Sequence, residues 1–284
     1  MKQIAGKWLT AALGVWCLSL VVSPTFAQVP DSARSSPEPA AVYPDRFMFR
    51  VGNYYLEDSS TAVSLNSSLG LLGTTIDFQR DLGGDQRTQV PRLAGYYRFT
   101  DKHRLDFGWF ELERKGQRSL AIEIQFGDEL IEIGNTVASV VDSTLFKLAY
   151  TYSFYRAPQV ELGFTAGLHT MRYDVELHDL NDDTKETAAV TAPLPVFGLR
   201  MDYSITPRWV TRFTIESFYI EIDDTIRGSL LDLNLDLEYR LARNLALGLG
   251  AGRLAIDAQV SDDSYNGELN DLYRGFQVFA VAYF

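Results

Sequence analysis

From residue 46 to the last residue, apolar and polar side chains alternate with a period of two in a series of segments. The clearest segment covers residues 231–241. Leucines and one tyrosine hold its odd positions, and the even positions are Asp232, Asn234, Asp236, Glu238 and Arg240. Successive side chains of a strand point to opposite faces of the sheet, so this segment has one hydrocarbon face and one charged face. The pattern predicts an all-β protein.

Ten segments carry the alternation: about 46–56, 88–100, 103–118, 138–156, 158–174, 190–205, 207–220, 229–241, 243–257 and 272–284. Short turns alternate with longer polar connections at 57–87, 126–136, 175–189, 221–228 and 258–271. Bacterial outer-membrane barrels show this asymmetry, and a tilted strand needs ~9–11 residues to cross the bilayer. We therefore predict an antiparallel up-and-down transmembrane β-barrel of about 10 strands. Eight or 12 strands are alternatives, because residues 57–87 could add strand, loop or plug.

The second face of the alternating segments favours a membrane protein. In 144–154 and 158–170, large apolar side chains share one parity, and small or charged side chains share the other. Hydrocarbon cannot satisfy an open sheet edge, so such a sheet has to close on itself. A soluble strand can also alternate with its apolar side in a core. A soluble secreted β-barrel binding protein therefore stays open as an alternative.

The N-terminal residues have the pattern of an export signal. Lys2 and Lys7 precede an apolar run over 8–22, and small residues near Ala27 suit a cleavage site. We predict a signal peptide at 1–27, a flexible periplasmic leader at 28–45 and the barrel at 46–284, reached by Sec-type export. Cys17, the only cysteine, lies in the signal, so the mature chain is expected to lack disulfides and thiolate metal sites.

The last strand, GFQVFAVAYF, alternates and ends on an aromatic residue, Phe284. It resembles the C-terminal strand of bacterial outer-membrane barrels, which the barrel-assembly machinery reads. The segments GTTIDFQRDLGG and YRFTDKHRLDFGWFELE resemble a group of uncharacterised Gram-negative outer-membrane barrels. The resemblance implies a location in the outer membrane and a partner that binds the strand ending at Phe284, but it implies no reaction.

The net charge of −11 disfavours nucleic acid as a partner. Outer-membrane lipid and lipopolysaccharide are the partners expected instead, and the oligomeric state is left open. Many of the acids fall in the predicted loops at 175–189 and 258–271. Carboxylates suit Ca²⁺ or Mg²⁺ at a lipopolysaccharide surface, but a solvated acidic rim explains them equally, and we predict no metal site.

The strand parities place eight cations and seven acids on the inner face of the barrel. This predicted lumen network comprises Arg50, Arg92, Arg98, Arg104, Lys147, Arg200, Arg212 and Arg240, with Asp106, Glu161, Asp202, Glu216, Asp232, Asp236 and Glu238. Buried charges need partners, and a barrel of this size has little room beyond its side chains. The near balance predicts a filled or narrowly hydrated lumen rather than a wide pore.

Candidate catalytic groups are sparse. A surface hydrolase acting on lipid or peptide would have to use His169 or His178, with Asp174 as a nearby acid, because a carboxylate can orient a histidine base. No serine neighbours either histidine. The sequence therefore favours a non-enzymatic outer-membrane barrel without a cofactor, in a structural, narrow-channel or surface-interaction role. The hydrolase is the alternative.

Overall fold

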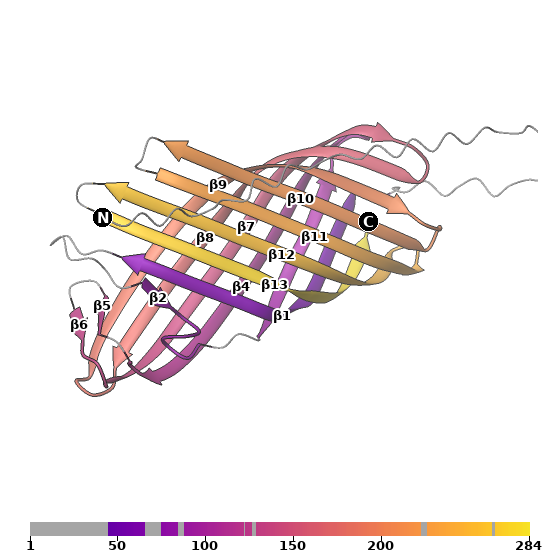
Figure 1. Ribbon diagram of the computed structural model, residues 1–284. Coiled ribbons are helices and arrows are strands. Elements are labelled where there is room, and N and C mark those ends of the chain that lie inside the picture. Colours follow the sequence, from indigo (N-terminus) through magenta and orange to yellow (C-terminus); the bar gives the residue numbers. More distant parts are fainter. Residues whose placement is uncertain are drawn as a thin grey trace, which may run out of the picture. The chain divides into compact units, whose positions relative to one another are not determined.

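The computed structural model describes residues 45–65, 75–84, 88–121, 123–126, 129–222, 226–262 and 265–284 (Figure 1). The expected signal peptide and nearly all of the expected leader lie outside these residues. The strands are β1 Phe47–Leu65, β2 Thr75–Asp77, β3 Gln89–Arg98, β4 His103–Ser119, β5 Ile124–Phe126, β6 Glu129–Ile131, β7 Thr136–Arg156, β8 Val160–Asp179, β9 Thr184–Ser204, β10 Trp209–Ile222, β11 Ile226–Ala242, β12 Leu245–Asp262 and β13 Tyr265–Tyr283. Within the described residues, no helix is long and apolar enough to cross a membrane.

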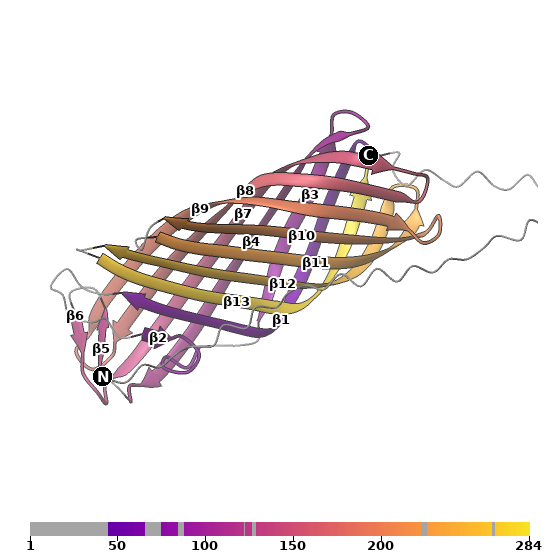
Figure 2. The same ribbon diagram turned by 45° about the horizontal axis from the view of Figure 1, so that its top comes forward.

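Ten of these strands form a closed antiparallel barrel. The order β13-β12-β11-β10-β9-β8-β7-β4-β3-β1 is completed by a β13–β1 pairing, and Figure 2 shows β10–β13 and β1 side by side. Phe47 and Phe284 exchange backbone hydrogen bonds at the closure, with N–O distances of 3.1 and 2.9 Å. The predicted ten-stranded barrel is confirmed, and the alternatives of eight or 12 strands are wrong. β2 pairs with β1, and β5–β6 form a separate hairpin.

One end of the barrel, which we name the terminal end, carries Phe47, Phe284 and the short turns. The opposite end, the distal end, differs from the prediction. The expected long loops at 175–189 and 258–271 are wrong, because β8 and β9 are separated only by residues 180–183, and β12 and β13 only by 263–264. The strands continue past the apolar band into segments whose outward side chains are polar, such as Glu176 and His178 on β8, so the pattern of a lipid-facing strand ends there. Asp183 turns the chain with a φ of 54°, which Asp tolerates.

The wall opens on one side toward the distal end. β9 and β10 pair from Ser204 and Val210 as far as Phe197 and Ser217, although both strands continue. The Ser204 amide donates to the carbonyl of Gln159 on the β8 side. Because the directions of the backbone amides alternate along a strand, the N–H groups of the odd-numbered residues in this part of β9 point toward β10.

Pro193 and Pro195 are the next odd-numbered residues of β9 after the last paired one, Phe197. Proline has no amide hydrogen, so both lack the donor that would continue the ladder to β10. Their register with β8 is uninterrupted, at Thr170 and Leu168. The two prolines therefore explain why the wall separates between β9 and β10 and not between β8 and β9.

The outer and inner faces of the barrel follow the strand parities. Outward side chains such as Phe164, Leu237 and Leu249 are apolar and exposed, as on a lipid-facing surface. Trp209 and Tyr239 pair across β10 and β11 near the terminal end, with ring centroids 4.8 Å apart. Amphipathic rings prefer the headgroup depth of a bilayer, so this pair suits a membrane boundary.

Candidate functional site

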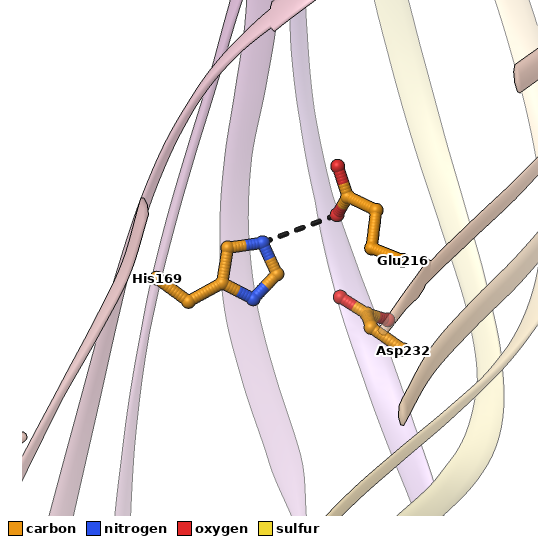
Figure 3. Close-up of side chains that lie close together, drawn as sticks. All are labelled: His169, Glu216 and Asp232. Atoms are coloured by element: carbon orange, nitrogen blue, oxygen red, sulfur yellow. Dashed lines mark hydrogen bonds and ion pairs between the residues drawn. The ribbon is translucent and has the colours of Figure 1, made fainter. Parts of the chain in front are cut away.

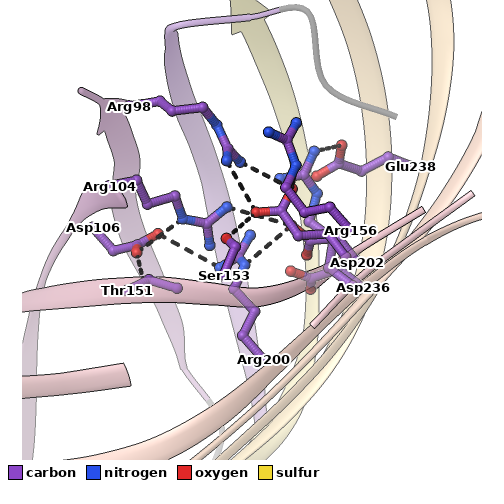
Figure 4. A network of polar contacts seen from close by, with 12 residues as sticks. Arg98, Arg104, Asp106, Thr151, Ser153, Arg156, Arg200, Asp202, Asp236 and Glu238 are labelled. Carbon is purple, nitrogen blue, oxygen red and sulfur yellow. Dashed lines mark hydrogen bonds and ion pairs between the residues drawn. The ribbon is translucent and has the colours of Figure 1, made fainter. Parts of the chain in front are cut away.

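The predicted lumen charges lie on the inner face of the barrel, where they contact one another across the lumen (Figure 4). Nine of the fifteen are buried and the other six are half-buried. The buried ones are Arg98, Arg104, Glu161, Asp202, Arg212, Glu216, Asp232, Asp236 and Glu238. These residues lie on strands that are far apart in the sequence, so their contacts form only when the barrel closes.

Glu238 is the centre of one group of ion pairs. Arg50 donates from Nη2 to Glu238 Oε1 at 2.6 Å, and Arg212 Nη2 lies 3.2 Å from the other carboxylate oxygen. Arg50 also pairs with Asp236, and the Tyr283 hydroxyl donates to Glu238. A carboxylate with no exposed surface is thus held by two guanidinium groups and a phenol.

A second group lies closer to the short turns of β3–β4 and β7–β8. Arg98 donates to both carboxylate oxygens of Glu161, at 3.0 and 3.2 Å. Asp202 accepts from Arg200 at 3.1 Å and from Arg104 at 3.4 Å. The fork-to-fork contact between Arg98 and Glu161 fixes the geometry of both partners.

Arg240 completes the charges at the terminal end by pairing with Asp45, with 3.2 Å between the nitrogen and the oxygen. A buried charge that loses its partner is strongly destabilising. The network therefore determines how the strands meet across the lumen, although each pair contributes little beyond its own desolvation cost.

His169, Glu216 and Asp232 come together from β8, β10 and β11 (Figure 3). One possible ligand atom of each lies within 4.8 Å of the other two, and His169 Nε2 is 3.1 Å from Glu216 Oε2. One imidazole and two carboxylates are donors that zinc accepts. The Lys147 ammonium contacts Asp232, however, and so already supplies a positive charge at this place.

The residues of the hydrolase alternative are not assembled. His169 faces the lumen and is fully buried, whereas Asp174 and His178 have the opposite parity on β8. His178 lies 2.9 Å from Asp183, and Asp174 pairs with Arg172 at 2.7 Å. Each candidate group thus has a different local partner, and the structure does not bring His169, His178 and Asp174 together.

A cavity of about 170 Å³ lies in the lumen beside the network. Charged side chains of β1, β3, β7 and β10 line it, together with His169 and the small residues Gly52, Ala94 and Gly108. Ala94 and Gly108 pair across β3 and β4, so two neighbouring inward positions carry almost no side chain. The lack of side-chain volume there is what leaves the space.

An apolar layer crosses the lumen on the distal side of this cavity. Each barrel strand contributes an inward side chain to it: Tyr54, Val90, Phe110, Leu145, Met171, Val196, Phe218, Leu230, Leu254 and Tyr273. All except Phe218, which is partly buried, have at most 5% of their surface exposed. His169 is one inward position nearer the terminal end than Met171, so it lies under the layer.

The sequence reasoning missed this layer. The sequence does carry a sign of it. Among the inward-facing residues of a strand, charged or small side chains give way to large apolar ones, as from Lys147 to Leu145 on β7 and from His169 to Met171 on β8. A second apolar cluster lies farther toward the distal end, with Phe78, Leu120 and Leu177 among its buried members. The lumen is therefore filled by both charged and apolar side chains.

No protein-family model and no curated protein sequence matches this chain. Among solved structures, the outer membrane protease OmpT from Escherichia coli is similar, with a TM-score of 0.51 and 9% identity over 84% of this chain and 97% of OmpT. Ail, the attachment invasion locus protein of Yersinia pestis, gives a TM-score of 0.33 at 9% identity over 82% of this chain and 99% of Ail. The P. putida toluene transporter TodX gives a TM-score of 0.33 at 10% identity over 85% of this chain and 91% of TodX.

Identities this low carry the fold and no activity, and of these three likenesses only that to OmpT is close enough to be used for the fold. It agrees with the closed antiparallel barrel of ten strands described above. The architecture is therefore that of an outer-membrane β-barrel protein.

Proposed function

We propose that this chain is a non-enzymatic barrel of the bacterial outer membrane whose lumen is closed and whose distal hairpins act at the cell surface. The observation that carries the proposal is the apolar layer to which all ten barrel strands contribute. An ion that crossed it would lose its hydration without gaining polar partners, which costs tens of kcal/mol in a simple Born estimate. The layer therefore favours a surface-interaction role over that of an open channel.

The strand lengths support an action outside the bilayer. β8 has 20 residues and β9 has 21, against the ~9–11 that a tilted strand needs to cross. Short turns belong on the periplasmic side of such barrels, so the terminal end is assigned to the periplasm. The distal half of each long strand then projects from the outer leaflet, where lipopolysaccharide is the partner at hand.

Assembly and export complete the proposal. The last strand ends at Phe284 and closes against β1, so the barrel-assembly machinery is proposed to bind this strand before closure. Sec-type export of a precursor with its signal at 1–27 would bring the chain to the periplasm. Outer-membrane lipid then contacts the exposed apolar side chains of the barrel wall.

A surface hydrolase is a weaker second candidate. OmpT, whose fold is similar, is named as a protease. In this chain, His169 is covered by the apolar layer and His178 is bonded to Asp183 on a two-stranded hairpin. These contacts favour the non-enzymatic role.

Cysteine labelling in intact cells tests the location and the orientation together. Cys17 is the only native cysteine and falls in the segment expected to be removed. We expect a membrane-impermeant maleimide to label Asp182→Cys, in the β8–β9 turn, and to leave Pro158→Cys, in the β7–β8 turn, unlabelled until the cells are broken. Labelling of Pro158→Cys alone, or of neither variant in a membrane fraction, would contradict the proposal.

A further inference from the structure

Five cations and three acids line the cavity in the lumen. The cations Arg50, Arg92, Lys147, Arg200 and Arg212 line it, against the acids Asp106, Glu216 and Asp236. Four of the five cations pair with a carboxylate, because Arg50 contacts Asp236, Arg200 contacts Asp202, Arg212 contacts Glu238 and Lys147 contacts Asp232. The exception, within the part of the chain that the structure describes, is Arg92.

Arg92 is held by aromatic rings instead of by an acid. Its guanidinium carbon lies 3.9 Å from the centre of the Tyr54 ring and 4.9 Å from that of Phe110. Such contacts are made through the faces of the rings and leave the N–H donors without acceptors among the described residues. The nearby carboxylate of Asp236 is already bonded to Arg50 and, at 2.6 Å, to the Gln277 amide.

Lys147 faces the same space as Arg92. Lys147 pairs with Gly108, and Arg92 pairs with Phe110, the next inward-facing residue of β4. The two cations therefore extend into the lumen from neighbouring positions along the barrel. Gly108 has no side chain to separate them, and a Cβ built there would be 3.6 Å from the Cβ of Lys147. Two like charges that face a common cavity repel one another unless an anion lies between them.

Unsatisfied donors line the same cavity. The Thr165 hydroxyl and the Nη1 atom of Arg212 are buried without a hydrogen-bond partner among the described atoms. Leaving such a group buried and unpaired destabilises the fold. Two buried donors and one unpaired guanidinium around one space indicate that a polar occupant belongs there.

We propose that this cavity binds a small inorganic anion, with the Arg92 guanidinium as its principal ligand and the Lys147 ammonium as a second cation. The volume of about 170 Å³ accommodates an anion of halide or phosphate size together with a few waters. The bound anion would supply the counter-charge that Arg92 lacks among the described residues. The inference concerns the inside of the barrel and does not depend on the surface role proposed above.

Crystallography with bromide tests the site directly. The full barrel is refolded from urea in sodium bromide, so that entry does not require the folded wall to open. We expect an anomalous bromide peak in contact with Arg92 and with no direct contact to a carboxylate. Well-ordered crystals in which the cavity holds only water, or a cation bound to Glu216, would overturn the proposal.

A solution measurement with a matched control gives an independent answer. In sodium bromide, we expect a higher thermal unfolding midpoint than in sodium gluconate of equal ionic strength, because the larger anion does not fit. Arg92→Gln should remove the difference. Arg114→Gln, which removes a buried lumen cation outside the cavity lining, should keep it. An equal difference in both variants, or none in the wild type, would show that no such site exists.

Discussion

The Lys147 ammonium contacts the Asp232 carboxylate at a place where His169 and Glu216 offer two further ligand atoms. Lys147 thus occupies the position that a divalent cation would take in a three-residue site. Because of this contact, the donor set alone does not indicate a bound metal, and the contact leads to the first prediction.

Lys147→Met should convert the cluster into a zinc site. The substitution removes the competing positive charge and leaves His169, Glu216 and Asp232 as one imidazole and two carboxylates, a set that zinc accepts. We expect about one zinc ion per barrel after refolding with Zn²⁺, measured by elemental analysis after gel filtration. The wild type should retain none.

The control for this prediction is Lys147→Met combined with His169→Ala, which removes the only nitrogen ligand. Zinc retained equally by the double variant would mean that the metal binds elsewhere.

Glu238→Gln should destabilise the barrel by about 3–5 kcal/mol, because half-buried Arg50 and buried Arg212 would lose their shared counter-charge. Glu221→Gln is the matched control. Glu221 pairs with Arg227 on the exposed surface, where solvent screens the pair and its contribution is small. Reversible urea unfolding in lipid vesicles measures both, and equal effects would refute the structural role of the Glu238 group.

Restoring an amide at the separated wall should extend the β9–β10 ladder. Pro195→Val supplies an N–H group on the side of β9 that faces β10, two positions beyond the last paired residue. We expect the new amide to exchange slowly with solvent in hydrogen-exchange NMR. Pro158→Val, in a turn, is the control and should leave the exchange of β9 unchanged. Rapid exchange at residue 195 would show that the separation has another cause.

The turn after β2 should depend on acid pH. The hydrogen bond from the Arg80 guanidinium lowers the pKa of Asp81, whose carboxylate also accepts from the Asp77 amide at 2.8 Å. Because the folded pKa lies below the unfolded one, ~3.9, the stabilisation is present above that pH. It is lost as the pH falls through the folded pKa. The protection of the Asp77 amide should decrease over this range in the wild type and be low at all pH values in Asp81→Asn.

The sequence predicts the barrel well because alternation, turns and the last strand are local signals. It does not predict where strands end beyond the bilayer, because there the apolar side chains of β8, Val175 and Leu177, face inward and the outward ones, such as Glu176, are polar. The inward parity of the charges can also be read locally. Their pairing cannot, since Arg50 and Asp236 are 186 residues apart and meet only when the barrel closes.

The apolar layer could not be predicted from local sequence either. Leu145 and Met171 each look like one more inward residue in the sequence. They form a barrier because register and closure bring inward side chains of ten strands into contact around the lumen. That arrangement is a property of the whole barrel, so no single segment reveals it.

Single-channel recording in planar lipid bilayers tests the closed lumen most directly. We expect the refolded wild type to insert without conductance steps. A variant in which Phe110, Leu145 and Met171 of the layer are all replaced by Gly should conduct, once heat-modifiable gel mobility shows that it has folded. A large and steady conductance of the wild type would contradict the account.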